Sequence, residues 1–119
     1  MATKAEIRDR AAENLGLLPV GQSLASQHVT RIEAGYDEVY AELKEEGLAV
    51  WANASEVPDK LVPWVSALVE LNCTETYPLS TPRYQRIIAK VGTDGSLARR
   101  AIRRLVTPDH VSLSEPTDY

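Results

Sequence analysis

Few side chains in this sequence are of the types that carry out covalent or metal chemistry. The two histidines, His28 and His110, fall in separate elements and match no zinc-binding spacing. The single cysteine, Cys73, falls in the most apolar segment, where a core role is commoner than a nucleophilic one. Residues 92–95, Gly-Thr-Asp-Gly, lack the lysine and the preceding strand of a phosphate-binding loop. We therefore expect no catalytic, cofactor-binding or metal-binding residue, and we predict that the protein is not an enzyme.

Arginine is the one residue type with binding chemistry that is clustered in the sequence. Its guanidinium group binds carboxylates and phosphates. Residues 83–104 carry seven basic groups and one acid, whereas residues 1–82 carry six basic groups and 13 acids. Four of the seven form one cluster: Arg99, Arg100, Arg103 and Arg104. This cluster predicts a surface for an acidic partner, either DNA or the acidic face of another copy of this protein. The alternative is a solvated helix face paired with acids of neighbouring helices.

The composition is that of one globular domain that needs no disulfide. The chain has 119 residues, of which 44% are hydrophobic and 25% charged, with a net charge of −4. This acidic balance argues against a general nucleic-acid binder. No apolar run approaches the ~20 residues of a membrane span, and the charged start lacks a signal-peptide core. We expect a soluble protein made in a reducing cytoplasm, with no membrane partner.

The apolar residues recur with a helical period. Thr3 and Glu6 predict a capping box that begins a first helix. A second helix is predicted to be capped by Ser23 or Ser26, and Gly35 within it is expected to mark a close approach of another helix. Its apolar stripe consists of Val29, Ile32, Tyr36, Val39 and Leu43. Trp51, which follows this helix, is a predicted core anchor.

Three more helices are predicted in the second half. The third extends to residues 75–77, with Pro63 either in its first turn or at a kink. The fifth is predicted to be capped by Ser96, after a turn at residues 92–95 that separates it from the fourth. Its inward residues are expected to be Leu97, Ala101, Ile102 and Leu105, with the four arginines projecting together elsewhere. The predicted fold class is all-α, a single-domain bundle of about four to five helices over residues 1–106.

Residues 107–119 differ from the bundle because they contain two prolines and no helical period. Their apolar side chains, Val111, Leu113 and Tyr119, are unusual for a purely solvated tail. The two interpretations are a disordered tail and an extended C-terminal arm that binds a partner through these side chains.

The order of elements resembles a known family. Residues 15–23, Leu-Gly-Leu-Leu-Pro-Val-Gly-Gln-Ser, follow the first helix, and residues 43–51, Leu-Lys-Glu-Glu-Gly-Leu-Ala-Val-Trp, end the second. Val57-Pro58 then opens an apolar helix, and an arginine-rich helix comes last. This pattern, over residues 4–106, is similar to that of the small head–tail connector (adaptor) proteins of tailed bacteriophages. These include the packaged-DNA-stabilisation proteins of short-tailed phages.

The resemblance implies a structural virion protein at the head–tail interface, assembled in the host cytoplasm and requiring no cofactor. Neighbouring copies would form a ring, by resemblance a dodecamer, beneath the portal protein. The ring would extend the channel for packaged double-stranded DNA, help to retain that DNA and attach a tail or nozzle protein. Val111, Leu113 and Tyr119 would then bind the portal, and the Arg99–Arg104 cluster would contact the portal, a neighbouring subunit or DNA.

The alternative function is a small helical DNA-binding regulator that reads DNA with the Arg99–Arg104 helix. Four arginines with no asparagine or glutamine beside them suit phosphates better than base edges, and the acidic body weakens association with DNA. An accessory subunit of an enzyme is the third hypothesis. The mass of the assembly in solution, with and without a portal ring, discriminates among the three.

Overall fold

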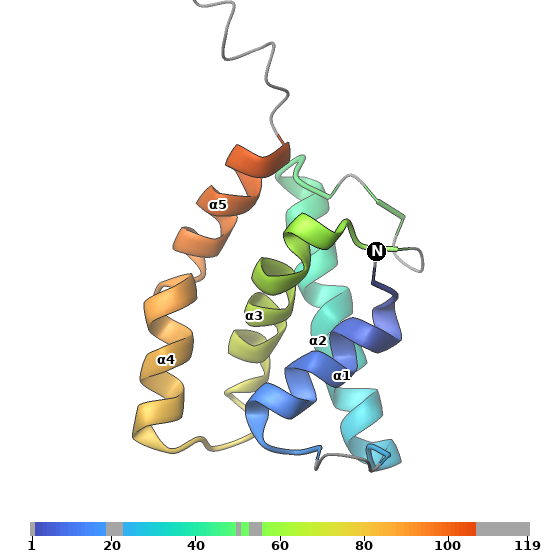
Figure 1. The fold of residues 1–119 in the computed structure, drawn as a ribbon, viewed down its shortest axis with the longest axis vertical. Helices are drawn as coiled ribbons and strands as arrows, with labels where there is room; N and C mark the ends of the chain where they lie inside the picture. The colour runs from blue at the N-terminus through green and yellow to red at the C-terminus, as the bar shows by residue number, and fades with distance from the viewer. Residues whose placement is uncertain (1, 19–22, 50, 53–55, 107–119) are drawn as a thin grey trace, which may run out of the picture.

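The computed structural model describes residues 2–18, 23–49, 51–52 and 56–106, which fold into a helical bundle (Figure 1). The α-helices are α1 (Lys4–Leu15), α2 (Ser26–Glu45), α3 (Val62–Cys73), α4 (Thr81–Val91) and α5 (Ser96–Val106), and a short 3₁₀ helix, η1 (Asp59–Leu61), precedes α3. An antiparallel bridge between Ala2 and Val57 adds no strand to the described part of the chain. The prediction of an all-α fold is confirmed. None of the described helices is long and apolar enough to cross a bilayer.

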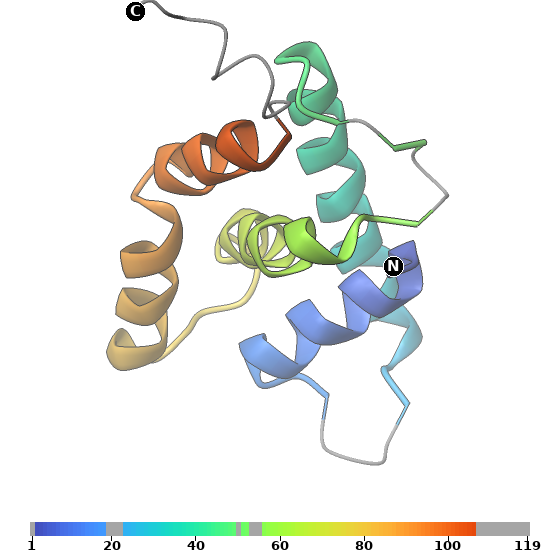
Figure 2. The same ribbon diagram turned by 45° about the horizontal axis from the view of Figure 1, so that its top comes forward.

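Helix α3 is the centre of the bundle and contacts all four other α-helices. Its composition explains this position, because apolar residues surround the helix and most of them are buried. Helices α1 and α2 lie on one side of α3, and α4 and α5 lie on the other, as Figures 1 and 2 both show. The outer faces of α2 and α4 are therefore on opposite sides of the molecule.

The start of α1 is the one that the sequence predicts, whereas the start of α2 is not. The Thr3 Oγ1 accepts a hydrogen bond from the Glu6 N–H at 3.2 Å, and the Glu6 carboxylate accepts one from the Thr3 N–H at 2.9 Å. The prediction of a serine cap on α2 is wrong. Ala25 occupies the N-cap position without a side-chain bond, and Ser26 is already helical. The backbone carbonyl of Ala25 closes the first turn, because it accepts hydrogen bonds from the N–H groups of His28 and Val29.

Helix α3 starts at Val62, with Pro63 in its first turn. It ends at Cys73, before the predicted residues 75–77. The hydroxyl of Thr74 donates to the Leu71 carbonyl at 2.7 Å, and the chain then turns. Competition of this kind between a threonine side chain and the backbone is a common reason for a helix to stop.

Two contacts secure α2 against the rest of the core. Trp51 is buried as predicted, and its indole Nε1–H donates to the Tyr36 hydroxyl at 2.9 Å. The Tyr40 hydroxyl donates to the Trp51 carbonyl at 2.7 Å.

Gly35 is buried against α3, where an added Cβ atom would lie 2.8 Å from the Asn72 Oδ1. The prediction of a close helix approach at Gly35 is confirmed.

Helix α5 is rotated relative to the expectation. Ser96 is already the first helical residue, so the prediction of a Ser96 cap is wrong. The Asp94 carboxylate, just before the helix, accepts a hydrogen bond from the Ser96 N–H at 3.0 Å. Leu97 is 43% exposed, whereas Ala98 and Ile102 are fully buried, so the expected inward position of Leu97 is also wrong. The small Ala98 lets α5 approach the core, and Ile102, one turn later, continues the contact.

Candidate functional site

The four arginines of α5 divide into two pairs by helix geometry, and the expectation that they project together is wrong. Arg99 and Arg103 are one turn apart and reach acids at the C-terminal end of α2. Arg100 and Arg104, also one turn apart, are exposed and form no ion pair with any described residue. Of these four arginines, Arg100 and Arg104 are the two whose guanidinium groups have no ion pair within the described residues.

Arg99 works inside the molecule. Its Nη2 lies 2.6 Å from the Glu42 Oε1, and its Nη1 donates to the Asp94 carbonyl at 2.9 Å. Its Nε lies 3.1 Å from the Glu46 Oε2 but is not aligned for a hydrogen bond. Arg103 is farther from Glu46, at 3.8 Å. The pairing that the sequence left open as an alternative thus applies to Arg99 and Arg103, which fasten α5 to α2.

Acids outnumber bases on α2, whereas α4 and part of α5 carry cations that have no ion pair with a described residue. On the α2 side, Lys4 lies 2.9 Å from Asp37, and Arg8 lies 2.7 Å from Glu33. On the other side, five cations have no ion pair within the part of the chain that the structure describes. We call this group the basic side: Arg83, Arg86 and Lys90 on α4, and Arg100 and Arg104 on α5. Its charge is left for a partner or for solvent ions.

The basic side also carries exposed apolar area. Tyr84 on α4 is 42% exposed and Leu97 on α5 is 43% exposed, and they are the large exposed hydrophobic residues of the described chain. On α5, Leu97 is followed at helical spacing by Arg100 and Arg104. Exposed tyrosine and arginine are enriched at protein interfaces, and α4 and α5 carry both.

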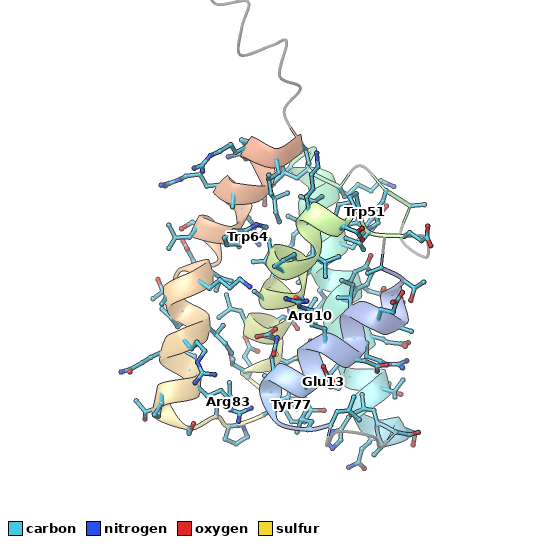
Figure 3. The ribbon with its side chains drawn as sticks, in the orientation of Figure 1. Arg10, Glu13, Trp51, Trp64, Tyr77 and Arg83 are labelled. Carbon is cyan, nitrogen blue, oxygen red and sulfur yellow. The ribbon has the colours of Figure 1, made fainter. Side chains whose placement is uncertain are left out.

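A cleft of about 410 Å³ lies between α1, α3 and α4. Figure 3 shows Arg10 and Glu13 of α1 and Arg83 of α4, three of the residues that line it. The Arg83 Nη1 donates to the Asn14 carbonyl at 2.8 Å and so links α4 to the C-terminal end of α1. Gly16 makes room for this contact, because a Cβ atom there would lie 2.7 Å from the same nitrogen. Its φ of +82° is also one that glycine adopts readily.

Glu70 of α3 lines the same cleft and is only 5% exposed. Its Oε2 accepts a hydrogen bond from the Asn14 Nδ2 at 2.8 Å. Burial raises the pKa of the Glu70 carboxyl, and the Asn14 bond and the charges of Lys90 and Arg10 partly oppose that rise. Sequence reasoning missed this cleft because its lining comes from three helices, and no single segment shows a pattern.

The other residues of potentially reactive types, Cys73 and His28, are buried or make contacts between elements of the fold. Cys73 is buried, and desolvation raises the pKa of its thiol to about 11, so the thiolate is scarce at neutral pH. The His28 Nδ1 lies 2.8 Å from the Tyr77 hydroxyl, a contact between α2 and the turn after α3. No group of three metal-ligating side chains occurs in residues 2–18, 23–49, 51–52 and 56–106. His110, Val111, Leu113 and Tyr119, and with them the predicted C-terminal arm, lie outside the described residues.

Comparison of the chain with protein-family models, with curated proteins and with solved structures found no match. The described residues form a bundle of five α-helices with an acid-rich side at α2 and a basic side at α4 and α5. The charges and contacts of these surfaces therefore carry the functional argument.

Proposed function

We propose that this protein is the subunit of a ring-forming head–tail connector of a tailed bacteriophage. The subunits dock beneath the portal, extend the DNA channel, help to retain packaged DNA and provide the attachment platform for a tail or nozzle protein. The observation that carries the proposal is the basic side, where five cations without ion pairs share two helices with Tyr84 and Leu97. The order of helices and loops, which resembles that of the connector proteins, supports the same function.

The position of the basic side suits a ring. Its two helices, α4 and α5, lie across α3 from α2. If the α4 side of one copy binds a different surface of the next copy, the contact is heterologous. A heterologous contact closes into a ring when the rotation between copies closes. Many weak contacts then act together, so that each subunit needs only modest affinity.

The arginines have two roles in this proposal. Arg99 and Arg103 hold α5 in place, and Arg100 and Arg104 contact the portal, a neighbouring subunit or the DNA. Contacts to phosphates or carboxylates suit a channel through which DNA slides, because base-specific contacts would oppose movement. The segment 107–119, with Val111, Leu113 and Tyr119, is the proposed portal-binding arm.

Assembly on a purified portal ring tests the proposal, with the mass of the complex and electron micrographs as readouts. The wild-type chain is expected to add a ring of copies to the portal. The double variant Arg100→Glu, Arg104→Glu should stay folded, since both side chains are exposed, but should fail to assemble. The matched control is Arg100→Lys with Arg104→Lys, which keeps both charges and should assemble.

Three further results decide the case. Deletion of residues 108–119 should leave the helical circular-dichroism signal unchanged and prevent joining to the portal. Normal assembly of the charge-reversed variant would remove the basic side from the mechanism. Tight, sequence-selective binding of a short DNA duplex by the isolated chain would favour the regulator function instead.

A further inference from the structure

The cleft between α1, α3 and α4 brings together cations that the sequence leaves far apart. Arg10 approaches it from α1, and Arg83, Arg86 and Lys90 approach it from α4 at spacings of three and four residues. None of the four forms an ion pair with a described acid, and Arg83 uses one N–H group on the Asn14 carbonyl. A guanidinium carries five N–H donors, so donors remain for a ligand.

The floor of the cleft has a different chemistry. Ala67 and Ile87 are buried there, and Glu70, which is only 5% exposed, adds a carboxylate. Within the described residues, Asn14 is the only hydrogen-bond donor to this carboxylate. A carboxylate accepts up to about four hydrogen bonds, so Glu70 has acceptor capacity left. The cleft therefore offers cationic donors at its edge and an anionic acceptor at its floor.

We infer that this cleft binds an extended, carboxylate-bearing peptide segment of a partner protein. A peptide supplies both kinds of group that the cleft lacks: side-chain carboxylates for the four cations, and backbone N–H donors for Glu70. The volume of about 410 Å³ falls within the range of ~300–1,000 Å³ that is usual for ligand clefts, and it suits a few residues of thin chain.

Nucleic acid fits the same cleft poorly. A phosphate backbone presents hydrogen-bond acceptors only, so it offers no donor to the carboxylates of Glu70 and Glu13. A duplex is also a convex rod, which meets an exposed surface more readily than a recess between helices. The cleft shares Arg83, Arg86 and Lys90 with the basic side, but the two proposals are tested by different variants, at Arg10 and Arg86 for the cleft and at Arg100 and Arg104 for the connector.

Binding of a fluorescently labelled peptide of alternating aspartate and serine to the full chain tests the inference. Saturable binding that weakens with salt is expected, because charge-assisted bonds carry it. Arg10→Glu with Arg86→Glu should weaken binding about tenfold or more, and both side chains are exposed, so the fold should persist. Arg100→Glu with Arg104→Glu is the matched control outside the cleft and should leave peptide binding unchanged.

Glu70→Gln tests the acceptor at the floor. This nearly isosteric change removes the negative charge but keeps a weaker carbonyl acceptor, so the affinity for tripolyphosphate should rise more than the affinity for the peptide. The inference is overturned if the peptide shows no saturable binding, or if the cleft variant binds it as well as the wild type does. Binding of a short DNA duplex that is stronger than peptide binding, and that the cleft variant abolishes, would assign the cleft to nucleic acid and overturn it too.

Discussion

Replacement of Gly35 tests the packing of α2 against α3. A Cβ atom at this position would lie 2.8 Å from the Asn72 Oδ1 and 3.2 Å from the Cys73 Sγ. Cys73 is fully buried and has little room to move. The Asn72 amide is held by two partners, since its Oδ1 accepts from the Arg31 Nη1 at 3.2 Å and its Nδ2 donates to the Glu38 Oε1 at 2.8 Å.

The magnitude follows from opposing contributions. Alanine in place of glycine favours the helix by about 1 kcal/mol. Displacement of the Asn72 amide costs about 0.5–1.5 kcal/mol for each hydrogen bond lost, and the contact with the Cys73 sulfur adds to that cost. We expect Gly35→Ala to lower the free energy of unfolding by about 1 kcal/mol. Gly35→Leu, which overpacks the contact, should lower it by about 2 kcal/mol or more.

Urea denaturation followed by circular dichroism measures both variants. The exposed neighbour provides the control, since Ala34→Leu should change the free energy of unfolding by less than about 0.5 kcal/mol. In an Asn72→Ala background, Gly35→Ala should lose much of its cost, because the colliding amide is gone. If Gly35→Ala instead stabilises the wild-type chain by the full ~1 kcal/mol of helix propensity, the close approach of α3 is refuted.

Three further predictions test the electrostatics of Arg99, Glu70 and Cys73. Arg99→Ala should lower the free energy of unfolding by about 1–2 kcal/mol, because it removes the link from α5 to α2, whereas Arg100→Ala should change it little in the same denaturation assay. Since burial raises the pKa of the Glu70 carboxyl, its ionised form opposes folding at neutral pH. Glu70→Gln should therefore be more stable than the wild type at pH 7, and a pH series should show the gain disappearing as the wild-type carboxyl becomes protonated at acidic pH. The Cys73 thiol, with its pKa raised from 9.0 to about 11, should resist iodoacetamide at pH 8 until the chain unfolds. Because ionisation of the buried thiol opposes folding, the free energy of unfolding should fall by up to about 3 kcal/mol as the pH rises from ~9 to ~11. Cys73→Ala should not show this fall. Rapid alkylation of the native thiol would contradict its burial.

Local interactions made much of the fold predictable from the sequence. The Thr3–Glu6 capping box and the burial of Trp51 are as predicted, and Pro63 takes the first-turn position, one of the two that the sequence left open. The apolar stripe of α2 likewise predicted a buried helix face, and Gly35 predicted a close neighbour. Periodicity of three and four residues is a property of a single segment, so one sequence reveals it.

The tertiary structure decided which charges remain for a partner. Arg99 and Arg100 are adjacent and chemically alike, yet one pairs with Glu42 and the other has no described ion-pair partner. The difference comes from the rotation of α5, which buries Ala98 where the sequence favoured Leu97. That rotation depends on contacts with α2 and α3, which are distant in the chain. The cleft has the same origin, because Arg10, Glu70 and Arg86 share one recess only after three helices pack together.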